Sequence, residues 1–230
     1  MDQVITLPGF SVAVAGGIAS GKSTLCLALK AELQKLAISV NYFCYDQFRR
    51  EILIGQRRES FELLCSSLKR EFGAEVFITP TLIHRLRLNE IIFADSAALK
   101  QFNDLIDPLI ISEMFNASNL ESDLTLVEWP CILERGLSGL CKNNVILVHC
   151  SVREQLRRLQ AGDLSSNEVK QRIRLQGSRE QRLELFVGLK KQEDQIRYAC
   201  ISELGANTNL SRDLASQISA KLKLNLEVCR

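Results

Sequence analysis

The sequence feature that most limits the fold is the segment Gly-Gly-Ile-Ala-Ser-Gly-Lys-Ser at residues 16–23. It matches the pattern G-x-x-x-x-G-K-[ST] at every fixed position. A short apolar run at residues 11–15 precedes it, as a buried parallel strand would, and leucines recur on one helical face from Ser23 to Leu36. A glycine-rich loop between a strand and a helix lets backbone N–H groups and the helix N-terminus surround a phosphate. The segment therefore predicts a P-loop.

Two side chains of this motif are expected to act on the nucleotide directly. Lys22 would reach the β and γ phosphates, and the hydroxyl of Ser23 would hold Mg²⁺. A P-loop also needs an acid near the metal, normally at the end of a neighbouring strand. Glu128 ends the apolar run at residues 124–127 and is the natural candidate. Spacing alone fits a surface glutamate at a strand end equally well, so both interpretations stay open.

Segments with the pattern of strands alternate with helical patterns along the chain. Besides residues 11–15, the strand-like segments are residues 40–44, 124–128 and 145–149. This alternation is typical of an α/β fold, here a P-loop NTPase fold with a parallel sheet flanked by helices. Asp46 follows the second strand and would lie beside the P-loop if the first two strands flank the site. Its carboxylate could accept a proton from an attacking hydroxyl, or it could begin a helix as the N-cap.

The 230 residues are long enough for a core with additional helical parts. A long helical stretch without a strand signal separates the second and third strands, and we expect it over the carboxyl ends of the strands, where ligands of open α/β sheets bind. A later helical stretch is rich in Arg, Gln and Glu, which suits a solvated lid. The predicted parts are a nucleotide-binding core (residues 1–46, 121–150 and 195–230), a helical insert (47–120) and a lid region (151–194).

Composition excludes several classes of protein. Lys plus Arg number 29 against 27 for Asp plus Glu, and this balance argues against a dedicated nucleic-acid binder. The eight cysteines contain no C-x-x-C pair, and the two histidines, His84 and His149, are far from forming a ligand cluster with them, so a zinc site is not expected. The chain has no signal-like start and no apolar run of membrane-spanning length. We expect a cytoplasmic protein with reduced, mostly buried thiols.

The residues so far indicate a P-loop phosphotransferase or NTPase, and a family resemblance narrows this. From about residue 12 to about 176, the chain resembles the dephospho-coenzyme A kinases, which phosphorylate the ribose 3′-hydroxyl in the last step of coenzyme A synthesis. The matches occur in the family's order and spacing. They are the P-loop through Thr24, Asp46 with Arg50, residues 72–73, Arg85 with Leu88, residues 93–95, Leu99, Asn103, Pro108, residues 128–134, Gln155, Arg158, Leu159, Arg172 and Gln176.

The resemblance implies an ATP- and Mg²⁺-dependent kinase with dephospho-coenzyme A as its small-molecule substrate. The insert would then bind the acceptor, and the lid arginines would neutralise the transferring phosphoryl group. The implied catalytic residues are Lys22, Asp46 as the base and Arg158 of the lid, with Ser23 and Glu128 at the metal. ATP would bind at Gly16, Gly17, Ile18, Ala19, Ser20, Gly21, Lys22, Ser23 and Thr24, with Asn207 in the adenine loop. The acceptor would contact Asp46, Arg50, Arg85 and Glu134.

The chain departs from the family pattern at four positions with chemical consequences. Cys44 and His84 stand where the family has aspartates, and Asp107 stands where it has a histidine. Gly162 stands where the family has its second lid arginine, whose loss can cost about 10³ or more in rate. Arg153, Arg157 or Arg174 could replace that arginine. We interpret His84 and Asp107 as surface helix residues and Cys44 as a buried thiol at a strand end.

These losses keep two other functions open. One is a degenerate protein that binds nucleotide or the coenzyme A precursor without catalysis and acts through partners. The other is a P-loop kinase for a different hydroxyl, such as that of a nucleoside. The retained acids and spacing favour an active dephospho-coenzyme A kinase over both, and the sequence does not specify an oligomeric state.

Overall fold

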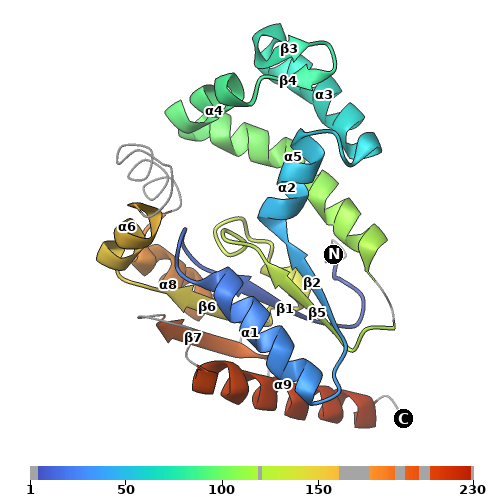
Figure 1. Cartoon of the computed structure of the whole chain (residues 1–230), viewed down its shortest axis with the longest axis vertical. Helices are drawn as coiled ribbons and strands as arrows, with labels where there is room; N and C mark the ends of the chain where they lie inside the picture. The colour runs from blue at the N-terminus through green and yellow to red at the C-terminus, as the bar shows by residue number, and fades with distance from the viewer. Residues whose placement is uncertain (1–4, 119–120, 161–176, 190–194, 202–207, 229–230) are drawn as a thin grey trace. The chain divides into compact units, whose positions relative to one another are not determined.

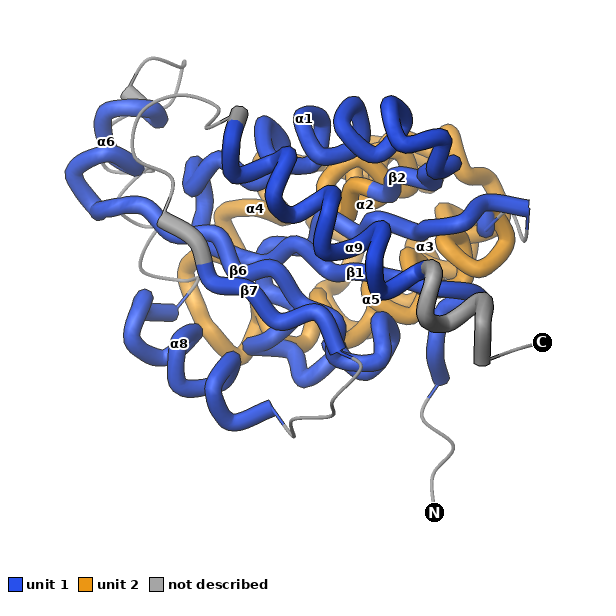
Figure 2. The backbone as a smooth tube through the Cα atoms, turned by 90° about the horizontal axis from the view of Figure 1, so that it is seen from below, with its two compact units in different colours: residues 1–43, 118–230 blue, residues 44–117 orange. Residues whose placement is uncertain are grey.

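The computed structural model describes residues 5–118, 121–160, 177–189, 195–201 and 208–228 (Figure 1). The chain divides into two compact units (Figure 2). The first contains Met1–Phe43 and Ser118–Arg230, and the second contains Cys44–Ala117.

A five-stranded sheet forms the centre of the first unit, with the strand order β2-β5-β1-β6-β7. The pairs β1–β5, β1–β6 and β6–β7 are all parallel, which confirms the predicted α/β fold. β5 lies between β1 and β2, so the first two strands are not neighbours in the sheet. The strands are β1 (Phe10–Ala15), β2 (Val40–Cys44), β5 (Leu124–Glu128), β6 (Val145–His149) and β7 (Arg197–Ile201).

The central strands are continuous apolar runs because helices cover the sheet. Every residue of β5 and β6 is buried. Two helices, α1 (Lys22–Lys35) and α9 (Thr208–Val228), pack against each other (Figure 1). Leu29 and Leu33 of α1 meet Leu214 and Ile218 of α9 in one buried cluster with residues of the sheet. This packing fixes α1, and therefore the end of the P-loop, on the sheet.

The second unit is mostly helical, but it contains a strand pair that we did not expect. β3 (Phe77–Thr79) and β4 (Leu82–Ile83) form a short antiparallel hairpin. Pro80 and Thr81 make the turn between them, and proline favours such a position because its φ is already fixed. The helices are α2 (Tyr45–Leu53), α3 (Arg58–Phe72), α4 (Arg85–Ala94) and α5 (Ser96–Ala117). That this unit binds the acceptor stays a prediction.

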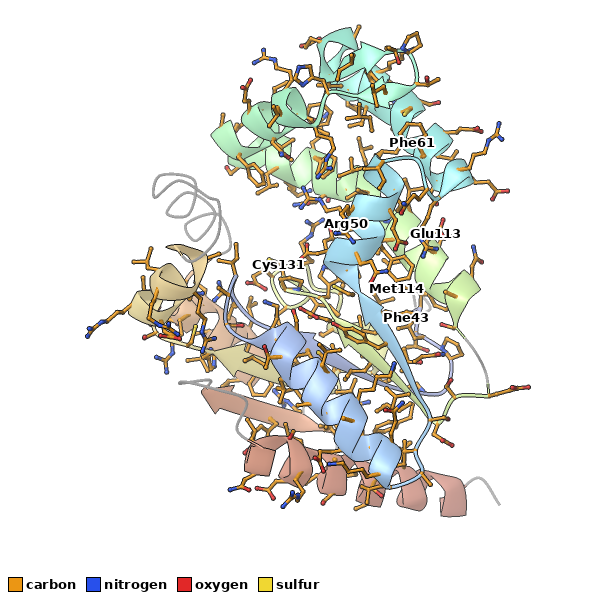
Figure 3. All side chains as sticks on the ribbon, in the orientation of Figure 1. Phe43, Arg50, Phe61, Glu113, Met114 and Cys131 are labelled. Carbon is orange, nitrogen blue, oxygen red and sulfur yellow. The ribbon has the colours of Figure 1, made fainter. Side chains whose placement is uncertain are left out.

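Polar side chains tie the helices of the second unit together. Asp107 of α5 is only 5% exposed and accepts a hydrogen bond from the Tyr45 hydroxyl at 2.8 Å, so its assignment to the surface was wrong. Glu113, also on α5 (Figure 3), accepts hydrogen bonds from Arg57 and Ser60. His84 caps α4 through its ring Nδ1, which accepts the backbone N–H of Arg87. His84 and Asp107 thus stabilise local structure here.

Within the described residues, no helix has both the length and the apolar character that crossing a membrane requires. The cytoplasmic location stays a prediction.

Candidate phosphoryl-transfer site

The P-loop connects β1 to the first residue of α1 at the carboxyl edge of the sheet. Close packing against the backbone requires the first of its two leading glycines, and the second lies against the ends of two side chains. A Cβ at Gly16, whose φ is +143°, would collide with the carbonyl oxygen of Val148 at the end of β6. A Cβ at Gly17 would lie 2.7 Å from Nε2 of Gln155. The first N–H groups of α1 have no partner within their own helix, which makes this turn suitable for a phosphate.

Lys22 and Ser23 begin α1. Lys22 is 6% exposed, and its ammonium group donates a hydrogen bond to the Gly17 carbonyl at 2.8 Å. The hydroxyl of Ser23 donates to Oε1 of Glu128 at 2.6 Å. Glu128 is 4% exposed, which rules out a surface glutamate. Its other carboxylate oxygen accepts a hydrogen bond from the hydroxyl of Tyr42.

Ser23 and Glu128 form a donor set that suits Mg²⁺. Hydroxyl and carboxylate oxygens are its preferred protein ligands, and Mg²⁺ commonly binds one or two of them together with substrate phosphates. In the described part of the chain, no group of three or more His, Cys, Asp or Glu residues could form an all-protein metal site. Tyr42 holds the carboxylate from β2. The role of this tyrosine cannot be seen in the sequence, because it depends on β2 lying next to β5.

Arg182 is the second residue that sequence analysis missed. It lies in α8 (Arg179–Gly188) and is 6% exposed. Its Nε donates to Oε1 of Glu134 at 2.7 Å, and a Cβ at Gly17 would lie only 3.2 Å from its Nη1. The guanidinium group therefore lies against the P-loop backbone. The sequence does contain a signal for the start of α8, which is the capping box formed by Ser178 and Gln181. It contains no signal for the direction in which the side chain of Arg182 points.

Glu134 interacts with two cations of the site, Arg182 and Lys22. Burial raises its pKa, while the positive charges of Arg182 and Lys22 oppose that rise. When it is ionised, the Glu134 carboxylate holds Arg182 in place and also interacts electrostatically with the ammonium group of Lys22. The structure thus brings Lys22, Glu134 and Arg182 together at the P-loop. Contact of Glu134 with the acceptor stays a prediction.

A second helix of the predicted lid, α6 (Val152–Gln160), also contacts the P-loop. Gln155 donates to the carbonyl of Ile18 at 2.8 Å, and Arg158 donates to the carbonyl of Ala19 at 3.0 Å. Arg158 also forms an ion pair with Glu154 at 2.7 Å. Hydrogen bonds from Arg157 and Arg158 lower the pKa of Glu154 to about 2, so this carboxylate is ionised at neutral pH.

The other arginines considered for the lid are less suitably placed, or lie outside the described residues. Arg153 is exposed on α6, and Arg157 is exposed and paired with Glu154. The predicted positions Thr24, Ser20 and Gly21 belong to the P-loop and the first turn of α1. Gly162, Arg172, Arg174, Gln176 and Asn207 lie outside the described residues.

The candidate base and the candidate acceptor residues other than Glu134 belong to the second unit. Asp46 is exposed in the first turn of α2, two residues after the end of β2. The N-cap residue of α2 is Cys44, which is half-buried, so the interpretation of Asp46 as an N-cap was wrong. Arg50 is exposed on α2 (Figure 3), and Arg85 is the exposed first residue of α4. Neither arginine forms an ion pair within the described residues.

Comparison with known proteins identifies the family. A family model described as dephospho-CoA kinase matches residues 10–187. The dephospho-CoA kinase of Aliivibrio fischeri is 30% identical over 176 residues, covering 76% of this chain and 91% of its own. That of Prochlorococcus marinus is 31% identical over 183 residues, covering 76% and 84%. The crystal structure of TT1252 from Thermus thermophilus matches with a TM-score of 0.64 and 25% identity over 93% of this chain and 98% of that one. The chain belongs to the dephospho-CoA kinase family.

Proposed function

We propose that the protein transfers the γ-phosphoryl group of ATP to the ribose 3′-hydroxyl of dephospho-coenzyme A, giving coenzyme A and ADP. The observation that carries the proposal is the family match over residues 10–187. That range includes the P-loop and the residues of α8 that lie against it. Members of this family are phosphotransferases with an alcohol acceptor.

The P-loop side of the reaction is assigned to residues of the first unit. The backbone N–H groups of residues 17–23 and the ammonium of Lys22 bind the β and γ phosphates. Ser23 and Glu128 would hold Mg²⁺, which when bound neutralises charge on the phosphates and fixes their orientation. Arg182 and Arg158 supply guanidinium groups beside the P-loop. We assign to Arg182 the stabilisation of charge on the transferring phosphoryl group, because its guanidinium is buried against Gly17.

The acceptor side is assigned to residues of the second unit. In the proposed step, the 3′-oxygen forms a bond to the γ-phosphorus while the bond from that phosphorus to the bridging oxygen breaks. The electron pair of the broken bond leaves with ADP, and the carboxylate of Asp46 takes the hydroxyl proton. Arg50 and Arg85 are exposed cations suited to the pyrophosphate of the acceptor.

The test is product formation by the purified protein. Incubation with ATP, Mg²⁺ and dephospho-coenzyme A is expected to give coenzyme A, detected by liquid chromatography and mass spectrometry. No product under conditions where an authentic dephospho-CoA kinase works would contradict the proposal. Thermal stabilisation by both substrates without product would then indicate the binding-only alternative. Transfer to uridine, with dephospho-coenzyme A inert, would indicate a kinase for another hydroxyl.

A further inference from the structure

The proposed mechanism gives no role to His149, the last residue of β6. Its side chain is nearly buried, with the residue 5% exposed, and its buried Nε2 has no hydrogen-bond partner among the residues that the structure describes. A buried polar atom without a partner is uncommon in proteins and needs an explanation, because leaving it unpaired costs free energy.

The surroundings of His149 connect it to the P-loop. The preceding residue, Val148, presents its carbonyl oxygen where a Cβ of Gly16 would be. From α8, the charges of Arg179 and Arg182 act on the imidazole. Arg182 lies against Gly17, as described above. The end of β6, the start of α8 and the first two residues of the P-loop thus form one packed cluster.

The charges of this cluster favour an uncharged imidazole. Burial and the two arginines both lower the pKa of His149 from its ordinary value. Other charged groups close to these arginines are Glu134, which binds Arg182, Lys22, whose charge acts on Glu134, and the exposed Glu180, whose carboxylate interacts with both Arg179 and Arg182. A proton on His149 would place a third positive charge beside Arg179 and Arg182 in a buried setting. Such a charge is unfavourable unless the arginines move away.

We infer that His149 is a positioning residue for phosphoryl transfer, whose neutral imidazole lets α8 pack with Arg182 against the P-loop and whose protonation releases that arginine. The inference rests on the proposed function, in which Arg182 stabilises the transferring phosphoryl group. The free energy that the neutral imidazole contributes to the packing of α8 is fully present at pH values above the ordinary histidine pKa of about 6.5. This contribution is lost as the pH falls below about 6.5 toward the lowered pKa of His149. Protonation of Glu134, whose pKa is raised, weakens its pairing with Arg182 in the same acidic direction.

The kinetic test compares pH profiles of kcat/KM for the wild type and two variants. His149→Asn keeps a neutral polar side chain that does not titrate. His84→Asn changes the other of the two histidines and preserves an N-cap, so it is the matched control. Because all three proteins use the same substrates, titration of the substrates cancels in the ratio of variant to wild type. Wild type and His84→Asn are expected to lose about tenfold in kcat/KM per pH unit once His149 is protonated.

His149→Asn is expected to lack this part of the decline, so its activity relative to wild type rises as the pH is lowered below about 6.5. An acid limb in His149→Asn that matches the wild type would overturn the inference. His149→Arg places a charge there that persists at pH 7.5, because arginine keeps its proton even when buried, and its kcat/KM at pH 7.5 is expected to resemble that of the wild type in acid. A His149→Arg protein with full activity at pH 7.5 would also overturn the inference.

A second measurement is independent of activity and of whether the His149 variants fold. The two histidines give two Cε1–H signals in ¹H–¹³C NMR spectra, and His84→Asn removes one of them, which assigns the other to His149. The His149 signal is expected to titrate below pH 6.5 in the wild type and at higher pH in Arg182→Gln, because a neighbouring positive charge is lost. A His149 titration that Arg182→Gln leaves unchanged would overturn the inference. Absence of coenzyme A at every pH would contradict the proposed function and leave this NMR result to decide the position of His149.

Discussion

Single residues at the P-loop differ in how their roles depend on the rest of the fold. Lys22 and Ser23 are placed by the motif itself, because loop and helix are contiguous in sequence. Glu128 takes part only because β5 lies beside β1, and its carboxylate is bound by both Ser23 and Tyr42. Arg182 takes part only because α8 packs beside the loop. In the proposed function, Lys22 binds the phosphates, Ser23 and Glu128 hold the metal, and Arg182 balances charge.

Arg182→Gln is expected to lower kcat by about 10³, because a guanidinium that stabilises a transferring phosphoryl group contributes at least that much. The KM for ATP is expected to change much less, since the P-loop backbone and Lys22 are retained. Steady-state kinetics with both substrates varied measures the two effects. Arg153→Gln is the matched control, because Arg153 is exposed on α6. A large loss in Arg153→Gln together with a small loss in Arg182→Gln would reverse the assignment of the arginine.

Asp46→Asn is expected to lose most of the turnover, by about 10² or more, because an amide cannot take the hydroxyl proton. ATP affinity, measured by calorimetry, is expected to stay at the wild-type value, since Asp46 is assigned to the acceptor. Gln47→Asn changes the neighbouring exposed residue of α2 and serves as control. An unimpaired Asp46→Asn enzyme would remove Asp46 as the base.

Among the elements, α1 connects catalysis to stability most directly, because the helix that begins with Lys22 and Ser23 is fixed by its leucine face. Leu25, Leu29 and Leu33 are buried, whereas Leu27 is 58% exposed on the same helix. Burying one such leucine contributes about 1.5–3 kcal/mol. The buried face places the first turn of α1 near the end of β1, where the proposed function has the phosphates bind.

Leu29→Ala is therefore expected to lower the free energy of unfolding by about 2–5 kcal/mol, through lost burial and the cavity left behind. Leu27→Ala, on the exposed face, is expected to change it by no more than about 0.5 kcal/mol. Urea denaturation followed by circular dichroism compares the two. Equal effects of the two substitutions would contradict the packing of α1 described here.

For the whole molecule, the parts that the sequence predicted are those set by local pattern. The P-loop, β5 and β6 were predicted because a glycine-rich motif and continuous aliphatic runs are visible within a few residues. β7 was not predicted as a strand, since Arg197-Tyr-Ala-Cys-Ile at the sheet edge has no such run. The hairpin of β3 and β4 was missed because its strands are two and three residues long.

The candidate site shows the same limit. The pairing of Ser23 with Glu128 involves the P-loop motif and the end of a strand, and both features can be recognised in the sequence. Tyr42, Arg182 and His149 could not be found that way, because each depends on which strands are neighbours or on how α8 packs. Burial of Asp107 was missed for a related reason, since its partner Tyr45 lies 62 residues away in the chain.

The two units are expected to divide the substrates between them, and kinetics can separate the two roles. Arg85→Ala removes an exposed cation of the second unit and is expected to raise the KM for dephospho-coenzyme A about tenfold, because charge-assisted hydrogen bonds to phosphate contribute about 1.5–3 kcal/mol. Its KM for ATP is expected to stay unchanged. Arg87→Ala removes a neighbouring cation that is paired with Glu90 and serves as control.

Ser23→Ala provides the reciprocal case in the first unit. It removes the hydroxyl that binds Glu128 and is expected to raise the Mg²⁺ concentration needed for half-maximal rate, with little change in the KM for dephospho-coenzyme A. The measurement is a Mg²⁺ titration at saturating substrates, run beside Arg85→Ala. If Arg85→Ala shifted the Mg²⁺ requirement, or Ser23→Ala the KM for dephospho-coenzyme A, the two roles would not be separable. If instead each substitution changes only its own parameter, nucleotide and metal binding belong to the first unit and binding of the charged acceptor belongs to the second. That division is the one expected from the chemistry of the side chains, because Ser23 and Glu128 suit a metal and the exposed Arg85 suits a phosphate.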